Sequence, residues 1–211
     1  MPSLSDELAI AHTLSIEGLA DTIQEIGFEC TRCGKCCKGD EEDPHTATIF
    51  PDEIRELQSI TDDKWENIAR PMPYGLENNN VTFEWALQTE EGDCVFYEEP
   101  DKNMGKCTVH GSHPLICQTY PFSIEIFGTV ESLGEKVDTA GFVTIHECEG
   151  IGRDIDRDHA EELAKTLKER AITEIEEAIA VTENYDPEKT DDVDIVVFDS
   201  EGAKHPDGSE Q

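Results

Sequence analysis

Basic residues and long hydrophobic runs are scarce in this sequence, and each scarcity excludes a class of partner. The chain has 16 Lys and Arg residues against 49 Asp and Glu residues, which gives a formal net charge of −33. A field of this sign repels nucleic-acid phosphates and anionic lipid surfaces. A helix that crosses a bilayer needs roughly 20 consecutive apolar residues, and no segment approaches that length. We therefore expect no nucleic-acid partner and no membrane association.

The sequence also lacks the features of secretion and of several enzyme classes. Residues 1–14 are acidic and contain no basic segment followed by an apolar block, which a signal peptide requires. There is no phosphate-binding glycine loop and no G-x-S-x-G motif. We expect a cytoplasmic protein whose partner, of unknown identity, is another protein.

Acidic residues are spread along the chain. Clusters recur at 40–43, 90–93, 154–162, 174–177 and 191–194. A single acidic tail that binds a basic partner is the alternative interpretation, but the excess occurs in nearly every segment. The pattern favours the proteome of an extreme halophile, because molar salt screens the self-repulsion that would otherwise loosen the fold.

Apolar spacing predicts helices near both ends of the chain. Residues 3–26 and 154–181 each place apolar side chains on one face, and the second segment has the more regular stripe. Pro51 suits the first position of another helix. A short helix containing Trp65 and Ile68 should follow it.

Alternation of apolar and polar residues predicts strands at 81–85, 122–127 and 142–145. The last two strands should pair across a long hairpin that contains Gly128 and Gly134. Helices and strands together predict an α+β fold, in which helices flank a small antiparallel sheet and loops carry the cysteines.

Eight cysteines carry the strongest chemical signal. Four form a C-x2-C-x2-C-C run and four follow downstream, at Cys30, Cys33, Cys36, Cys37, Cys94, Cys107, Cys117 and Cys148. Two-residue spacing lets a turning backbone direct successive sulfur atoms toward one point, and Gly34 permits the left-handed geometry that such turns often need. Arg32 and Lys35 add positive charge, which stabilises thiolates around a metal. The run therefore predicts a metal site.

Three other roles for the cysteines compete with metal binding. Disulfides are disfavoured, because a cytoplasmic chain of this length can build an ordinary core. Burial as small apolar side chains would explain Cys94 or Cys148 singly, but not four cysteines within eight residues. A catalytic thiol is disfavoured because no single Cys–His pairing stands out.

The identity of the metal is less sharply indicated. Adjacent Cys36 and Cys37 point in diverging directions, so they would serve two centres, bridge a polynuclear site, or leave one thiol structural. A C-x2-C-x2-C run with a remote cysteine before proline is typical of bacterial [4Fe–4S] sites, and Cys117 stands four residues before a proline. Structural zinc normally uses two separated pairs, which the spacing of Cys94 and Cys107 does not match. The sequence favours an iron–sulfur cluster, with zinc as the alternative.

The downstream cysteines lie in recognisable contexts: GDCVF at 92–96, GKCTVH at 105–110, HPLICQTYPF at 113–122 and CEGIG at 148–152. With the run, these motifs resemble the YkgJ-type CxxCxxCC cysteine-cluster family, whose members are regarded as zinc- or iron-chelating and are often called Fe–S-cluster-containing. The resemblance covers about residues 28–153. We expect the cysteines at 30–37 to meet Cys94, Cys107, Cys117 and Cys148 at a shared metal centre.

The chain departs from the family pattern on both sides of Cys117. The family usually has arginine where this chain has His113 and Gln118. Any role that the two arginines have in the family is therefore not carried over to this chain, whereas the role of Cys117 is unaffected.

Histidines near the cysteines are further candidate ligands. His110 and His113 flank Cys117, but a turn position for His110 and replacement of a basic residue by His113 are the preferred interpretations. For His146, a position at a sheet edge is preferred. Tyr120 is expected to pack over the site and limit access of solvent.

The expected organisation has four parts. They are an N-terminal helix over residues 1–27, a cysteine-cluster metal-binding domain over 28–153, an amphipathic helix over 154–182 packed on that domain, and an acidic mobile tail over 183–211. Within the tail, residues 195–198 would add an edge strand.

Three functions fit this organisation. The first is a cluster-binding protein in electron transfer, redox sensing or metal handling. The second is a structural-zinc module for protein interaction. The third is an accessory component or enzyme in protein modification, which the absence of a cofactor motif or a second large domain weighs against. The sequence leaves enzymatic activity undecided and favours a non-enzymatic role.

Overall fold

The computed structural model consists of two compact units, each described here by itself. The described residues are 3–40, 42, 44–73, 80–101, 104–127, 136–190 and 195–211. Unit 1 comprises Met1–Cys36, Glu99–Gly105 and Leu115–Glu176, and unit 2 comprises Cys37–Glu98, Lys106–Pro114 and Glu177–Gln211. Helices and several small, mostly antiparallel sheets confirm the predicted α+β class.

Unit 1 is built around a long C-terminal helix. Its helices are α1 (Leu4–Thr13), α2 (Ile16–Ile26), α6 (Leu115–Thr119) and α7 (Arg157–Asn184), of which the last turns of α7 belong to unit 2. The predicted helix over 154–181 is confirmed by α7. The prediction of one helix over 3–26 is wrong at its middle, because Ser15 caps a new helix by accepting a hydrogen bond from the Gly18 backbone N–H at 3.2 Å.

A three-stranded antiparallel sheet packs against these helices. Its order is β10 (Lys136–Ala140), β11 (Val143–His146) and β9 (Phe122–Ile124). The predicted pairing is confirmed, since Phe122 lies opposite Ile145. The expected hairpin residues Gly128 and Gly134 lie outside the described residues.

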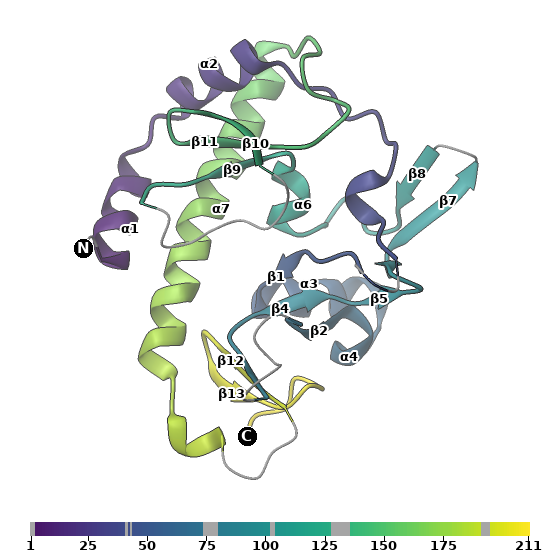
Figure 1. Ribbon diagram of the computed structural model, residues 1–211, viewed down its shortest axis with the longest axis vertical. Coiled ribbons are helices and arrows are strands. Elements are labelled where there is room, and N and C mark those ends of the chain that lie inside the picture. The colour runs from purple at the N-terminus through teal and green to yellow at the C-terminus, as the bar shows by residue number, and fades with distance from the viewer. Residues whose placement is uncertain are drawn as a thin grey trace. The chain divides into compact units, whose positions relative to one another are not determined.

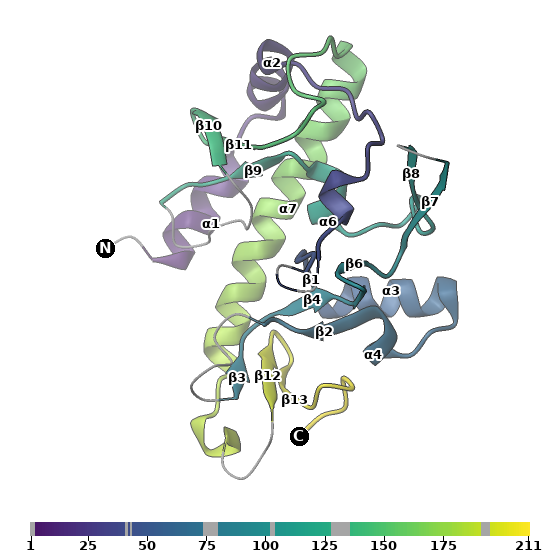
Figure 2. The same cartoon turned by 45° about the vertical axis from the view of Figure 1, so that its right-hand side comes forward.

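The core of unit 1 lies where α2, the sheet and α7 meet, as both views show (Figures 1 and 2). Helix α7 contributes apolar side chains at helical spacing, which puts them on one face. The fully buried members of this core are Ala20, Ile23, Phe122, Ala160, Ala164 and Leu167. Phe28, just after α2, packs edge-on against Phe122 with ring centroids 5.6 Å apart.

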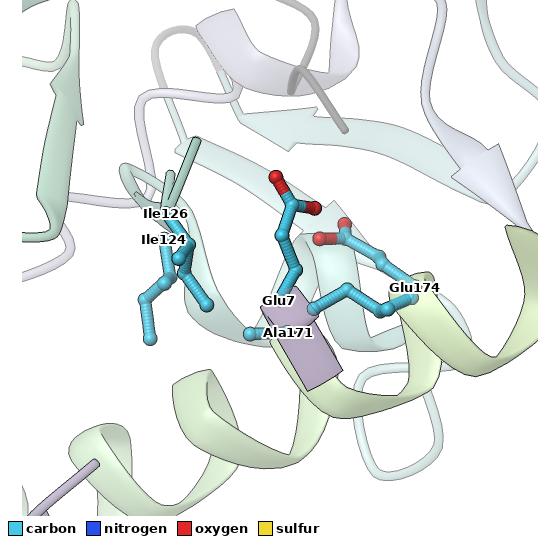
Figure 3. Close-up of a pocket in the computed structure, with 6 residues that line it drawn as sticks. Glu7, Ile124, Ile126, Ala171 and Glu174 are labelled. Atoms are coloured by element: carbon cyan, nitrogen blue, oxygen red, sulfur yellow. The ribbon is translucent and has the colours of Figure 1, made fainter. Parts of the chain in front are cut away.

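One buried cation ties α7 to α6 and β9. The Arg170 guanidinium donates to Thr119 Oγ1 at 2.9 Å and to the Phe122 carbonyl at 3.1 Å, and it pairs with Glu174 at 2.7 Å. Because Thr119 and Phe122 stand on either side of residues 120 and 121, Arg170 fixes the chain at both ends of this segment. Figure 3 shows the carboxylates of Glu7 and Glu174, the partner of Arg170, directed to the same side of a small cavity that Ile124 also lines.

Unit 2 is made of many short elements. The elements that lie wholly in unit 2 are β1 (Thr48–Ile49), α3 (Pro51–Thr61), α4 (Trp65–Ile68), β2 (Ala69–Pro71), β3 (Val81–Thr82), β4 (Trp85–Leu87), β5 (Thr89–Glu90), β6 (Asp93–Cys94), η2 (Pro187–Thr190), β12 (Val196–Asp199) and β13 (Gly202–Lys204). Unit 2 also contains the last residue of η1 (Lys35–Cys37) and parts of β7 (Tyr97–Asp101) and β8 (Met104–Cys107). The predicted helix starting at Pro51 is confirmed. The predicted strand over 81–85 is divided between β3 and β4.

Residues 196–204 form a packed hairpin within the segment that composition assigned to a mobile tail. β12 is the central strand of the order β13-β12-β3, so the expectation of an edge strand there is wrong. Val196 and Phe198 are buried with Ala203. The Lys204 ammonium pairs with buried Asp199 at 2.8 Å, and Asp199 also accepts from the Trp85 indole N–H at 2.8 Å.

Candidate metal centre

The cysteine run begins where two distant segments of unit 1 pair. Phe28 and Ile151 form an isolated antiparallel bridge, and the Glu29 backbone N–H donates to the Gly150 carbonyl at 3.1 Å. Gly150 permits this approach because a Cβ there would lie 2.4 Å from the Glu29 carbonyl oxygen. The pairing brings the chain before Cys30 alongside the chain after Cys148.

The run itself turns through two left-handed residues. Gly34 has φ of 76°, which confirms the expected left-handed geometry. Arg32 also has positive φ, 55°, and its carbonyl accepts a hydrogen bond from the Gly105 N–H at 2.8 Å. These turns lead into η1, which contains Cys36 and Cys37.

Four thiols of unit 1 are electrostatically coupled. Burial raises the pKa of the Cys148 thiol, and the charges of Cys36, Cys33 and Cys30 raise it further. The Gly150 backbone N–H donates to Cys148 Sγ at 3.4 Å, and this contact lowers the same pKa. Placing several thiolates close together costs repulsion energy, which a bound cation offsets. We call Cys30, Cys33, Cys36 and Cys148 the unit 1 thiol set.

Tyr120 lies beside this set. Its hydroxyl donates to the Glu147 carbonyl. Burial raises the pKa of Tyr120 to about 12, and the charges of Cys148 and Cys36 contribute to the rise. The phenol is therefore neutral beside the thiols, of which Cys30 and Cys36 are exposed.

An exposed ion pair flanks the set. The Lys35 ammonium lies 2.6 Å from the Glu149 carboxylate, and a hydrogen bond from the Cys33 side chain is among the contacts that lower the pKa of Glu149. The sequence predicted that Lys35 would compensate thiolate charge. In the structure, the contact with Glu149 is the main cause that raises the pKa of Lys35, and the charge of Cys33 has a smaller effect in the same direction.

The remaining unit 1 cysteine, Cys117, lies in α6 and is partly buried. Arg170 holds the end of this helix through Thr119. The charges that act on Cys148 thus place a second remote cysteine beside the run, in addition to Cys117, which the sequence offered as a loose match to the [4Fe–4S] pattern.

Three cysteines belong to unit 2. Cys94 in β6 is buried, and Cys37 and Cys107 are partly buried. We call Cys37, Cys94 and Cys107 the unit 2 thiol set. All eight predicted cysteines are thus located, five in unit 1 and three in unit 2.

His45 is a buried histidine of unit 2. Its backbone N–H donates to the Gly92 carbonyl at 2.7 Å, whereas its side-chain Nε2 is buried and finds no hydrogen-bond partner among the described residues. Burial and the positive charge of Arg70 lower the pKa of His45 to about 4, against a smaller opposing effect of Asp93. The imidazole is therefore neutral near pH 7.

The histidines singled out in the sequence make contacts with a ring or a hydroxyl. His110 and His113 stack on each other with ring centroids 4.9 Å apart. The Nε2 atom of His146 shares a hydrogen bond of 2.9 Å with the Ser123 hydroxyl. The preferred sheet-edge position for His146 is wrong, because β11 is the central strand of its sheet.

The donor chemistry fits a thiophilic metal, since thiolates hold zinc and iron–sulfur clusters alike. Within the described residues, no three His, Cys, Asp or Glu side chains are arranged to hold a metal ion. Binding would therefore draw the thiols closer together. In the same part of the chain, no helix has both the length and the apolar character needed to cross a membrane.

Sequence reasoning did not single out His45 as a ligand, or Glu149 and Gly150 as parts of the site. Glu149 is one of 49 acidic residues, so composition could not distinguish it. Gly150 directly follows the Cys148-Glu149 pair, and a glycine at such a place is the one signal from which a close backbone approach could have been predicted. A lone histidine such as His45 gives no sequence signal of burial.

Comparison with known proteins adds one finding. The family described as "CxxCxxCC: Putative zinc- or iron-chelating domain" matches residues 29–141, which is more than half of the chain. The matched range contains the whole run together with Cys94, Cys107 and Cys117, and it ends before Cys148. No significant match was found among curated proteins or among solved structures.

Proposed function

Because this chain belongs to the CxxCxxCC family of zinc- or iron-chelating domains, we propose that unit 1 holds an iron–sulfur cluster through Cys30, Cys33, Cys36 and Cys148. The backbone pairing of residues 28 and 29 with residues 150 and 151 carries the proposal, because it joins the run to the remote cysteine. A C-x2-C-x2-C run with one distant cysteine is a common ligand pattern of [4Fe–4S] clusters. A bound cluster supplies one-electron transfer.

The neighbouring residues suit the surroundings of such a cluster. The Gly150 N–H donates to a thiol sulfur, and hydrogen bonds to sulfur ligands tune the reduction potential of clusters. Tyr120 lies beside the thiols with a neutral phenol, and we expect its ring to limit solvent access to a bound cluster. The role that follows is electron transfer, redox sensing or metal handling together with a protein partner.

Cys33→Ala tests the assignment. Protein purified without air should show a broad visible absorbance, with iron and sulfide in equal amounts, and the Cys33→Ala variant should lose most of both. His12→Ala is the matched control, because His12 is an exposed residue of α1 and should retain them. Full iron retention in the Cys33 variant would refute the proposal.

A structural zinc site is the second candidate. The four thiols of the unit 1 set match the all-cysteine ligand set of many structural zinc sites. A colourless protein that retains zinc and is indifferent to reductant would establish this alternative, in which the unit serves protein interaction.

The setting we propose is a cytoplasm with high salt. The support is the charge of −33 and its spread along the chain. Thermal melts across a KCl series should show much higher stability in molar salt than at about 0.1 M. Equal stability at both concentrations would defeat the halophilic interpretation.

A further inference from the structure

Three segments of unit 2 that carry cysteines contact one another. The Gly39 backbone N–H donates to the Asp93 carboxylate at 3.0 Å, which joins the end of the run to the strand of Cys94. Gly92 approaches Asp40 so closely that a Cβ would lie 2.5 Å from its backbone. The segment just after Cys37 therefore lies against the segment just before Cys94.

The segment of Cys107 joins the same place. The Thr108 backbone N–H donates to the Phe96 carbonyl at 2.9 Å, and the Thr108 hydroxyl donates to the same oxygen at 3.3 Å. The Lys38 ammonium lies 5.3 Å from the centre of the Tyr97 ring. Residues next to Cys37, Cys94 and Cys107 are therefore connected by direct contacts within unit 2.

The local geometry of η1 separates Cys36 from Cys37. A 3₁₀ helix has 3.0 residues per turn, so consecutive side chains leave it about 120° apart. The two adjacent thiols therefore cannot point in the same direction. The division of the chain falls between the same two residues, with Cys36 in unit 1 and Cys37 in unit 2.

A fourth donor lies beside these segments. The His45 backbone N–H donates to the Gly92 carbonyl, and Gly92 directly precedes Asp93, whose carboxylate accepts from Gly39. Its Nε2 atom is buried and has no hydrogen-bond partner among the described residues. Buried polar atoms without a partner are uncommon, and an absent ion is one explanation for them.

We propose that Cys37, Cys94, Cys107 and His45 form a second metal site, separate from the unit 1 thiol set, and that it takes zinc. Three cysteines and one histidine are a common ligand set of structural zinc. The inference rests on the proposed function in that thiols of this chain bind metal. It extends that function by assigning the cysteines to two centres.

The short strands of unit 2 give this site a structural role. β5 pairs with β6 over two residues of each strand, and β7 and β8, of which residues 97–98 and 106–107 belong to unit 2, form a two-stranded sheet. Two-stranded ladders of this size are marginal in water. A zinc ion that links their ends would stabilise them, because binding to the folded form alone adds to folding stability.

Metal analysis of paired variants tests the division. The full-length protein and the double variants Cys94→Ser/Cys107→Ser and Cys30→Ser/Cys148→Ser would be purified without air and assayed for iron, sulfide and zinc. We expect the first variant to lose zinc and keep iron, and the second to lose iron and keep zinc. Loss of both metals in both variants, or zinc retained in the first, would overturn the proposal.

The extended X-ray absorption fine structure of zinc in the unaltered protein gives the type and number of its ligands. Because this measurement needs no variant, the test remains decisive if a variant misfolds. Three sulfur ligands and one imidazole nitrogen support the site, and four sulfur ligands overturn the role of His45. His45→Ala should weaken zinc retention against a chelator, whereas His110→Ala is the matched control and should not.

The outcome also separates this inference from the iron–sulfur proposal. If the protein is colourless and each double variant loses one of two zinc ions, the two-centre division stands and the cluster proposal fails. If iron is bound but zinc is absent from the unaltered protein, the cluster proposal stands and this inference fails.

Discussion

The two units hold their thiols by different means. In unit 1 the run follows a helix whose apolar face is buried against the sheet and α7, and Phe28 anchors it to Phe122. In unit 2, Cys94 lies in a two-residue strand, Cys107 ends a four-residue strand and Cys37 lies in a turn of 3₁₀ helix. Backbone anchored on a packed core should keep its fold without metal, whereas backbone in short ladders should gain stability from the metal.

The units also differ in how they use charge. Unit 1 buries one arginine among groups that satisfy it, and the side chains of Arg170 and Glu174 are 4% and 12% exposed. Unit 2 places Glu201, which is 42% exposed, between Arg55 and buried Lys204. Loss of the buried group should cost far more than loss of an exposed one.

Metal removal should have the largest effect, because it should loosen the short strands around the unit 2 thiol set and leave the packed core of unit 1 intact. After chelation under reducing conditions, backbone amides of β5, β6, β7 and β8 should exchange with solvent at rates close to those of unfolded peptide, because little else holds them. Amides of α7 and β11 should stay protected. Hydrogen exchange read by mass spectrometry makes the comparison, and equal deprotection in both units would contradict it.

Phe122→Ala should remove the anchor of unit 1. The ring is fully buried and touches Phe28, so the free energy of unfolding should fall by about 3–5 kcal/mol. Iron retention should fall as well, since the segment before Cys30 loses its support. Denaturant unfolding measures the change. Phe142→Ala, at a side chain 43% exposed, is the control and should change stability by less than about 0.5 kcal/mol.

Arg170→Met should cost about 3 kcal/mol, because it leaves the Glu174 carboxylate, which is only 12% exposed, without its cation. The double variant Arg170→Met/Glu174→Met removes both charges and should be more stable than the single variant. Denaturant unfolding of the two variants tests this. A double variant that is no better than the single one would contradict a stabilising role for the pair with Glu174.

Gly150→Ala should disturb the junction of the two unit 1 segments. The new Cβ would meet the Glu29 carbonyl at 2.4 Å, so the backbone beside Cys30 and Cys148 must separate. We expect a loss of about 1–3 kcal/mol and weaker iron retention. Gly152→Ala is the matched control, because nothing lies within 4 Å of a Cβ there, although its φ of 79° adds some strain. Equal iron retention in both variants would contradict the junction.

Glu201 should give the smallest effect. Its bonds to Arg55 and Lys204 lower its pKa to about 2 from an ordinary value of 4.5. The folded state therefore gains stability above pH 4.5 that is lost as the pH falls toward 2. Solvent screening limits the gain to below about 1 kcal/mol. In Arg55→Gln, unfolding measured between pH 4.5 and 2 should vary less with pH, and an unchanged slope would contradict the assignment.

The sequence predicted the elements whose pattern is local. The spacing of Leu163, Leu167 and Ala171 predicted α7, and the alternation around Phe122 and Ile145 predicted a strand pair. It failed at Ser15, where one side-chain cap divides a continuous apolar pattern into two helices. It also missed the packing of Val196 and Phe198, because their burial depends on distant Val81 and not on the acidic residues around them.

The candidate site was predictable in its donors and not in their grouping. Two-residue spacing and Gly34 indicated a turning thiol loop, which the backbone confirms. The coupling of Cys148 to the run depends on a glycine contact between residues far apart in the chain, and no local pattern contains it. The burial of His45 is likewise set by tertiary packing.

Metal content of the unaltered protein tests the central claim most directly. The full chain, purified without air and without chelators, would be analysed for iron, sulfide, zinc and free thiols. We predict iron and sulfide in equal amounts, near-stoichiometric zinc and no disulfide. Protein that is free of metal, or whose thiols are joined in pairs, would contradict the account.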